Sequence, residues 1–262
     1  MGGSLRQSET VPLKRLLEER YGRVICYPKY DQRELERRVK ELEKLGVQAV
    51  EFAGRKSAFD VPVLGKGCVG IVIVALTDKG KVALKVRRID ADRTGMQREA
   101  EMLERANNVG IGPRLLGTTE NFLLMEFVDG ALLPQWVELL KGKGTRSRIR
   151  RVLREVLEQC WRLDESGLDH GELSRAPKHV IVDSDDHPCL VDFETASLHR
   201  RVSNVTSICQ YLFIGSQAAK TIKKKHGEIN REDLIKALGM YKQQRTRENF
   251  EKVLKACRLH NV

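Results

Sequence analysis

The feature that most constrains the fold is a glycine-rich turn between two runs of β-branched residues. It reads Gly-Lys-Gly-Cys-Val-Gly, with glycines at positions 65, 67 and 70. Dinucleotide-binding folds use the same spacing, but there a helix must begin at the glycines. Here the next residues are Ile71-Val72-Ile73-Val74, which favour a strand. We therefore expect a β-turn-β flap whose backbone can approach phosphates closely; the alternative is a glycine hairpin without a ligand.

A lysine in the following apolar strand adds a second constraint. Lys85 lies inside Val82–Val86, fifteen residues after Gly70. A buried ammonium group needs an anion nearby. Glu99, in a helix predicted over 92–107, is the best protein partner, and Glu101 is the alternative on another helix face. The competing interpretation is a solvent-exposed lysine on an edge strand.

The stretch from Leu163 to Ala196 carries the second group of polar residues. It predicts a helix end, a polar loop that begins His170-Gly171-Glu172, two short strands, and then Asp192-Phe193. A loop, strand, turn and strand followed by Asp-Phe is how protein kinases place a catalytic carboxylate beside a metal-binding one. Each motif alone is a weak signal, so their order along the chain carries the argument.

Composition limits the class of protein. The 262 residues are 41% hydrophobic and 32% charged, which suits a globular protein. No apolar run is long enough to cross a bilayer, and residues 1–10 lack the apolar core of a signal peptide. The six cysteines include no CxxC pair, which argues against a zinc site or a disulfide framework. We expect a cytoplasmic protein with no membrane partner.

In order and spacing, these motifs resemble the eukaryotic-like protein kinase fold from about Asp60 to Ile214. The chain is most similar to small atypical members, the RIO kinases and the small kinase of the KEOPS tRNA-modification complex, since no long activation segment or Ala-Pro-Glu motif follows Asp192. The resemblance implies an α+β, bilobal fold. Its expected parts are an N-terminal α/β extension over 1–56, a strand-rich N-lobe over 57–128 and a minimal helical C-lobe over 129–262.

The extension is predicted to be a β-α-β unit. A strand is expected over Val24–Pro28 and a second over 48–54, with a helix between them that is capped by Asp31. A further helix is expected over residues 12–22. Bracing of the N-lobe is favoured over partner docking, because nothing in this segment is chemically distinctive.

The resemblance also implies roles for individual residues. The flap residues Gly65, Lys66, Gly67, Cys68 and Gly70 would cover the phosphates of ATP. Lys85, paired with Glu99, would hold the α- and β-phosphates. Met125 would lie behind the adenine, with backbone groups from Glu126 to Val128 bonded to it. Asp192 would bind Mg²⁺ or Mn²⁺.

The catalytic loop departs from the family pattern. Glu172 stands where the family has its aspartate base, and Asp169 is the second candidate for that base. The position of the second metal ligand, an asparagine, falls on Pro177. A loop two residues longer would bring Lys178 or His179 there: His179 could ligate a metal or be a plain loop residue, and Lys178 could replace a metal's charge. Glu194 replaces the family glycine, and could be an extra acidic ligand or an exposed residue that caps the next helix.

The net charge of +11 predicts an anionic partner. Residues 141–154 hold seven Lys and Arg and no acid, and residues 220–262 hold 12 basic against 5 acidic side chains. Such clusters, over 141–154 and 220–258, favour RNA or a ribonucleoprotein, whereas a solvated helix face is the alternative. No aromatic residues are interleaved for base stacking.

Together these features favour an ATP-dependent protein serine/threonine kinase that acts on a protein substrate. The first alternative is an ATP-binding pseudokinase or scaffold on an RNA or ribosome-maturation complex. A small-molecule kinase of the aminoglycoside type fits less well, since its acceptor pocket is usually larger and acidic. A NAD enzyme fits least, because a strand follows the glycines.

Overall fold

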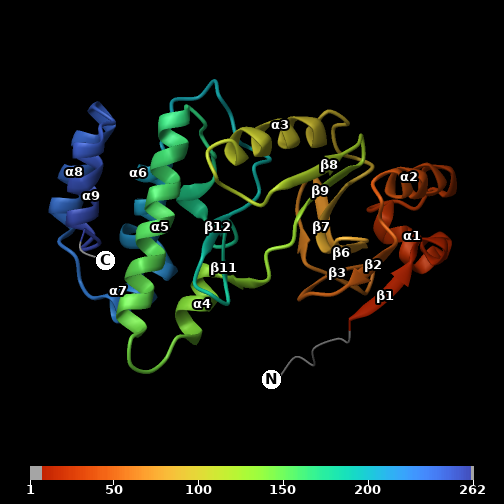
Figure 1. Ribbon diagram of the computed structural model, residues 1–262, viewed down its shortest axis with the longest axis horizontal. Coiled ribbons are helices and arrows are strands. Elements are labelled where there is room, and N and C mark those ends of the chain that lie inside the picture. Colours follow the sequence, from red (N-terminus) through yellow and green to blue (C-terminus); the bar gives the residue numbers. More distant parts are fainter. Residues whose placement is uncertain (1–7, 261–262) are drawn as a thin grey trace. The chain divides into compact units, whose positions relative to one another are not determined.

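The computed structural model describes residues 8–260 and divides them into two compact units (Figure 1). The strand-rich unit holds the described residues up to Glu104 together with Arg114–Phe127, and the helical unit holds Arg105–Pro113 and the chain from Val128 onward. Residues 1–7, which fall in the segment expected to lack a signal peptide, lie outside the described part. Within that part, no helix combines the length and the apolar character that a membrane crossing requires.

The strand-rich unit is built on one antiparallel sheet in the order β1-β2-β6-β7-β9-β8. The short strand β5 pairs with the N-terminal part of β6. A separate hairpin is formed by β3 and β4. The strands are β1 (Glu9–Pro12), β2 (Ala49–Phe52), β3 (Lys56–Ala58), β4 (Val61–Val63), β5 (Gly65–Lys66), β6 (Gly70–Thr77), β7 (Gly80–Arg87), β8 (Leu115–Thr118) and β9 (Phe122–Glu126).

The prediction of a strand over Val24–Pro28 is wrong. Residues Glu19–Ile25 form helix α1, which follows a 3-10 turn over Leu13–Leu17. Tyr21, Val24 and Ile25 are buried at helical spacing, so packing outweighs the β propensity of Val24 and Ile25. The first strand of the extension is instead β1, which pairs with β2, and β2 pairs with β6.

Helix α2 (Gln32–Lys44) begins as predicted, with the Asp31 carboxylate accepting a hydrogen bond from the Glu34 amide at 2.8 Å. Its buried face includes Arg38, which is fully enclosed. The Arg38 guanidinium donates to the carbonyls of Ile25 and Arg87, each at 2.6 Å, and to Asn121 Oδ1 at 2.9 Å. A buried, fully paired charge thus joins α2 to β7 and to the turn before β9.

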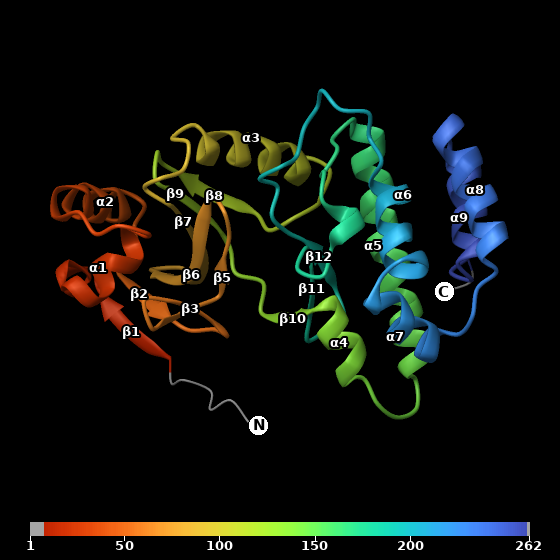
Figure 2. The same cartoon turned by 180° about the vertical axis from the view of Figure 1, so that it is seen from behind.

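The helical unit is organised around the 22-residue helix α5 (Thr145–Ser166), whose apolar stripe is buried as its spacing predicts. It packs against β12, α6, α7 and α9. The other elements, also visible from behind in Figure 2, are α4 (Leu133–Leu139), α6 (Asn204–Cys209), a π-helical turn (Gln210–Ile214), α7 (Gln217–His226), α8 (Arg231–Gln243), α9 (Arg247–Ala256), β10 (Gly130–Leu132), β11 (Val180–Asp183) and β12 (Pro188–Leu190). Helix α3 (Gly95–Asn107) starts in the strand-rich unit. The expected α+β class is confirmed.

Candidate active site

Lys85 and Glu99 form a buried ion pair in the strand-rich unit. Lys85 comes from the middle of β7 and Glu99 from α3, and their exposed fractions are 5% and 3%. Lys85 Nζ lies 2.9 Å from Glu99 Oε1 and 2.7 Å from Oε2. Glu101, the alternative partner, is exposed. The helical period therefore presents Glu99 to Lys85 and turns Glu101 to solvent.

The glycine flap is a tight turn between β5 and β6, in which the Gly67 amide donates to the Gly70 carbonyl at 2.8 Å. A Cβ at Gly70 would lie 2.9 Å from the Val86 carbonyl oxygen and 3.2 Å from the Lys85 stem, so only glycine fits there. At Gly65 and Gly67 the nearest atoms would be 3.5 and 3.6 Å away, which leaves ordinary room at those two positions. This bare backbone suits the close approach of a phosphate.

The other flap side chains point to different surroundings. Cys68 is exposed. The Lys66 ammonium lies over the Tyr27 ring, 4.6 Å from its centroid, in a cation–π contact. Lys66 is therefore held partly by the N-terminal extension.

The segment predicted to face an adenine begins at the end of β9 and continues to Val128. Met125 and Val128 are half-buried, and Glu126 is exposed. The Glu126 amide donates to the Arg114 carbonyl at 2.9 Å. The Glu126 amide is therefore already engaged in the pairing of β9 with the chain next to β8.

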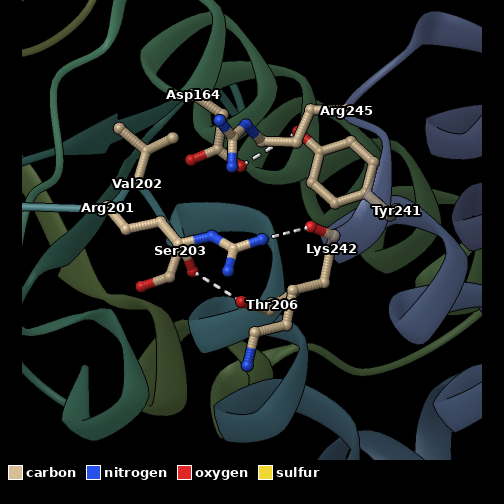
Figure 3. A pocket seen from close by; sticks show the side chains of 8 residues that line it. All are labelled: Asp164, Arg201, Val202, Ser203, Thr206, Tyr241, Lys242 and Arg245. Carbon is tan, nitrogen blue, oxygen red and sulfur yellow. Dashed lines mark hydrogen bonds between the residues drawn. The ribbon is translucent and has the colours of Figure 1, made fainter.

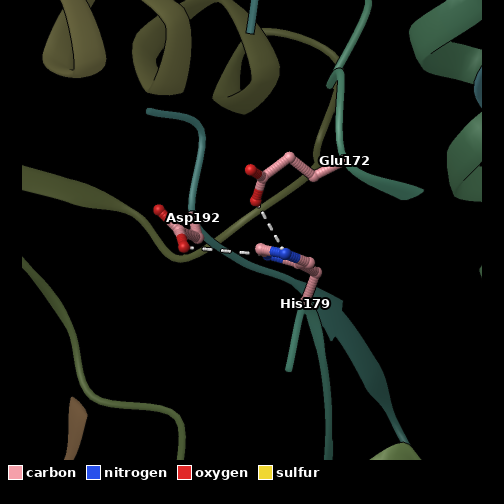
Figure 4. Close-up of side chains that lie close together, drawn as sticks. All are labelled: Glu172, His179 and Asp192. Carbon is pink, nitrogen blue, oxygen red and sulfur yellow. Dashed lines mark ion pairs between the residues drawn. The ribbon is translucent and has the colours of Figure 1, made fainter. Parts of the chain in front are cut away.

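In the helical unit, Glu172, His179 and Asp192 converge (Figure 4). His179 Nε2 lies 2.9 Å from Glu172 Oε2, and His179 Nδ1 lies 3.7 Å from Asp192 Oδ2. One ligand atom from each residue lies within 4.8 Å of the others. The β11–β12 hairpin brings His179 and Asp192 together, because it pairs Val180 with Leu190.

The structure distinguishes the two candidates for the missing asparagine. His179 is 1% exposed, whereas the Lys178 side chain is 61% exposed, with its ammonium 3.9 Å from Asp192 Oδ2. Burial lowers the pKa of His179, although Asp192 and Glu172 oppose the shift. Its Nδ1 is buried without a hydrogen-bond partner among residues 8–260. A neutral imidazole beside two carboxylates is a donor set that fits a divalent metal ion.

Asp192 adopts a left-handed backbone conformation, with φ of 72°. Such a conformation is unusual for a residue other than glycine, and it often marks a functional position. Phe193, which follows, is buried against the His170 ring with centroids 5.0 Å apart. The buried phenylalanine thus fixes the turn that presents Asp192.

A buried polar network holds the loop from behind. The His170 amide donates to Asn204 Oδ1 at 2.8 Å, and Asn204 Nδ2 donates to Asp164 Oδ1 at 2.8 Å. Tyr241 of α8 donates to Asp164 Oδ2 at 2.9 Å, beside a small pocket of about 190 Å³ (Figure 3). Burial lowers the pKa of His170 to about 4, so its ring is neutral at pH 7. The sequence analysis did not identify Asn204, Asp164 and Tyr241 as part of the site. The one signal available was the helix predicted to start near Asn204.

Asp169, the second candidate for the base, has other partners. It is buried, its carboxylate pairs with Arg200 at 2.9 Å, and it accepts from the Ser203 amide at 3.1 Å. Pro177 is exposed and Glu194 is half-buried. Asp169 thus binds the chain segment that follows Asp192, whereas Glu172 remains 40% exposed.

Comparison with known proteins identifies the domain that carries these residues. Residues 76–203 match the family model described as the RIO domain. The match includes Lys85, Glu99 and the Glu172, His179 and Asp192 group, and it begins after the glycine flap. No curated protein matches the chain. The chain therefore carries a RIO domain over residues 76–203, which is consistent with an atypical protein kinase of the RIO type, and its α+β architecture is consistent with a bilobal kinase-like fold.

Proposed function

We propose that the protein is an ATP-dependent serine/threonine protein kinase that uses Mg²⁺ or Mn²⁺. The observation that carries the proposal is the convergence of Glu172, His179 and Asp192 within a RIO domain. Phosphoryl transfer needs little covalent chemistry from the protein, and depends mainly on positioning and charge stabilisation. Acidic and imidazole ligands beside an accessible carboxylate supply the groups for both.

The strand-rich unit would supply the nucleotide contacts. In this proposal Lys85, held in one orientation by Glu99, donates to the α- and β-phosphates. The flap backbone at Gly65 and Gly67 approaches the phosphates closely, because no side chain intervenes. Met125 packs against the base, and the Glu126 carbonyl and the Val128 amide recognise its edge.

The helical unit would supply the metal ligands and the base. A bound divalent cation would offset the negative charge of the transferring phosphoryl group. Asp192 and His179 would hold that cation. Glu172 would accept the proton of the serine or threonine hydroxyl, because it is the more exposed of the two candidate carboxylates.

A second candidate function is a nucleotide-binding pseudokinase or scaffold, for instance on an RNA or ribosome-maturation complex. The contact between Glu172 Oε2 and His179 Nε2 favours it, since a carboxylate bonded to an imidazole is a weaker proton acceptor. The absence of the family's aspartate at this position favours it as well.

The test is transfer of labelled phosphate from ATP to the protein itself and to a basic protein substrate, with Mg²⁺ or Mn²⁺. We expect Lys85→Ala, Asp192→Asn and Glu172→Gln each to lower the rate by at least about 100-fold, the usual cost of a misplaced or missing catalytic group. Glu101→Gln, on the exposed face of the same helix as Glu99, serves as the control and should keep the wild-type rate.

The outcomes separate the two candidates. Loss of transfer in all three variants supports a kinase with a glutamate base. No transfer by the wild type, with ATP raising the melting temperature of the wild type but not of Lys85→Ala, establishes the pseudokinase. Neither transfer nor ATP-dependent stabilisation would reject both.

A further inference from the structure

The basic residues of α5 divide into two groups by the partners of their guanidinium groups. Arg148 forms a two-bond pair with Asp186 at 2.6 and 2.7 Å, and Arg151 lies 3.2 Å from the same carboxylate. Asp186 sits in the turn between β11 and β12. These two arginines therefore share the one Asp186 carboxylate, and Arg148 holds it with the stronger, two-bond contact.

Arg146 and Arg150 belong to the second group. With Arg154 they are spaced four residues apart, so the three side chains share one face of α5. Arg154 donates to the carbonyls of Leu259 and His260, at 3.3 and 3.2 Å, and lies 3.8 Å from Glu158. Within residues 8–260, no ion pair neutralises Arg146 or Arg150.

The end of α9 adds a third cation to this face. The Arg154 bonds hold residues 259 and 260 against α5, and the His226 ring contacts the Cys257 carbonyl through Nε2 at 2.9 Å. A Cβ on Gly227, the next residue along the chain, would lie 2.8 Å from Arg146 Nη2. Arg258 follows Cys257, is exposed, and has a left-handed φ of 58°. The end of α7, the end of α9 and the arginine face of α5 therefore meet.

The charges in this cluster repel one another. Burial lowers the pKa of Arg150, and Arg146 and Arg258 lower it further. The same three arginines oppose protonation of the buried His226. Glu228 is near Arg258, but its carboxylate is paired with Lys223. Among residues 8–260, the cluster therefore holds no carboxylate that is left to pair with these arginines.

Two buried nitrogen atoms in the cluster also lack a hydrogen-bond partner in the described part of the chain: Arg150 Nε and His226 Nδ1. His226 is fully buried. Because His226 Nε2 donates to the Cys257 carbonyl, His226 Nδ1 is an acceptor, and Arg150 Nε–H is the donor of the two. Buried donors in folded proteins are nearly always satisfied, so this one marks a place for an acceptor. Here an anion would satisfy a guanidinium donor and relieve the repulsion at once.

We propose that Arg146, Arg150 and Arg258 form a binding site for a phosphate group. Guanidinium groups match phosphate oxygens with paired hydrogen bonds, which favours a tetrahedral oxyanion over chloride. The phosphate can come from a free phosphate or phosphate monoester, or from the phosphodiester backbone of RNA. None of the three residues offers an aromatic face for a base, so the site recognises the phosphate alone.

The direct test is the arginine Nε–H region of a ¹⁵N–¹H NMR spectrum of the full chain, titrated with inorganic phosphate at constant ionic strength against chloride. The signal that disappears in Arg150→Gln identifies Arg150. We expect phosphate to shift it saturably and to raise the melting temperature of the wild type. Arg151→Gln removes the same charge one residue away and should keep both effects, whereas Arg150→Gln and Arg258→Gln should lose the stabilisation.

The same variants distinguish the two sources of phosphate. The affinity for a fluorescent oligouridylate is measured by fluorescence anisotropy at several salt concentrations. If RNA supplies the phosphate, Arg146→Gln and Arg150→Gln should weaken binding several-fold and reduce the salt slope by about 1 each, while Arg151→Gln changes neither. Unchanged RNA binding together with a phosphate-dependent shift assigns the site to free phosphate or a monoester. An Arg150 signal that moves with neither ligand overturns the proposal.

Folding does not confound this test. Because Arg150 carries a buried, unpaired donor, Arg150→Gln should melt no lower than the wild type in phosphate-free buffer. A variant that melts well below the wild type there would show that Arg150 already has a stabilising partner, and that result also contradicts the site.

Discussion

The two groups of candidate active-site residues are built in different ways. Lys85 and Glu99 lie in the middle of regular elements, a strand and a helix, and each is the other's buried counter-charge. Glu172, His179 and Asp192 lie in irregular segments next to a 3-10 turn and two short strands. Their positions depend on residues from α5, α6 and α8, which hold the loop through hydrogen bonds.

This difference indicates which kind of change should disturb each group. A pair on regular elements is fixed by backbone geometry, so replacing one member removes a counter-charge from the buried other member. A loop group is fixed by a network, so its geometry depends on the protonation and packing of residues behind it. The following predictions test this contrast, from the largest effect to the smallest.

The largest effect is expected from separating the strand-rich pair. Lys85→Met removes the cation 2.7 Å from the buried Glu99 carboxylate, and should lower the free energy of unfolding by roughly 3–5 kcal/mol. The double variant Lys85→Met/Glu99→Leu removes both charges and should recover most of this loss. Urea denaturation measures both values.

Glu101→Gln is the matched control for that pair, because it changes an exposed carboxylate on the same helix. It should alter stability by no more than about 0.5 kcal/mol. If Lys85→Met is as stable as Glu101→Gln, the pair does not anchor the strand-rich unit and the contrast fails.

The second effect concerns the free energy of unfolding at acidic pH, through His170 in the loop that carries Glu172. The pKa of His170 falls from 6.5 in the unfolded chain to about 4 in the folded protein. Between these values the unfolded chain binds more protons, so stability is full above pH 6.5 and is lost as the pH falls towards 4. The loss from this one residue should reach roughly 3 kcal/mol.

The comparison that isolates this effect is the pH dependence of unfolding in the wild type and in His170→Gln. The variant should lose less stability between pH 6.5 and 4, whereas His187→Gln, which changes an exposed turn histidine, should follow the wild type. Parallel curves for all three proteins would mean that His170 is not held neutral by its surroundings.

The smallest effect is expected on metal affinity. Glu172 contacts the Nε2 side of His179 and Asp192 lies on the Nδ1 side, so Glu172→Gln should weaken Mn²⁺ binding by about 10-fold through loss of imidazole orientation. His179→Asn should reduce the preference for Mn²⁺ over Mg²⁺, since imidazole suits transition metals better than Mg²⁺. Electron paramagnetic resonance of free Mn²⁺, with and without an ATP analogue, measures the affinity and, in competition with Mg²⁺, the preference. Equal affinity in wild type and His179→Asn would exclude His179 as a ligand.

Much of the local structure follows from the sequence. The 3.6-residue spacing of apolar residues predicts α5 over Thr145–Ser166, and Asp31 predicts the start of α2. The run of β-branched residues after Gly70 predicts β6 in place of a helix. These elements could be predicted because their signals are local: periodicity, capping and turn chemistry act within a few residues.

Some elements could not be predicted, because distant contacts decide them. Val24 and Ile25 have the propensity of a strand, yet burial of their helical face beside Tyr21 makes α1. Arg38 looks like one more charge on an amphipathic helix, yet it is fully buried and bonded to β7 and Asn121. Propensity is a weak signal, and the free energy gained by packing against another segment exceeds it.

By itself, the sequence determined the α+β class and the RIO-type motifs, and it placed Glu99 and Glu101 on different faces of one helix as candidate partners for Lys85. Only the tertiary structure decided that His179 is the buried neighbour of Asp192 while Lys178 faces solvent. It also decided that Arg148 and Arg151 share the Asp186 carboxylate, whereas Arg146 and Arg150 form no ion pair within residues 8–260. Spacing along one element fixes which face a residue occupies, but the partner on that face comes from segments far away in the chain, and burial and charge pairing select it.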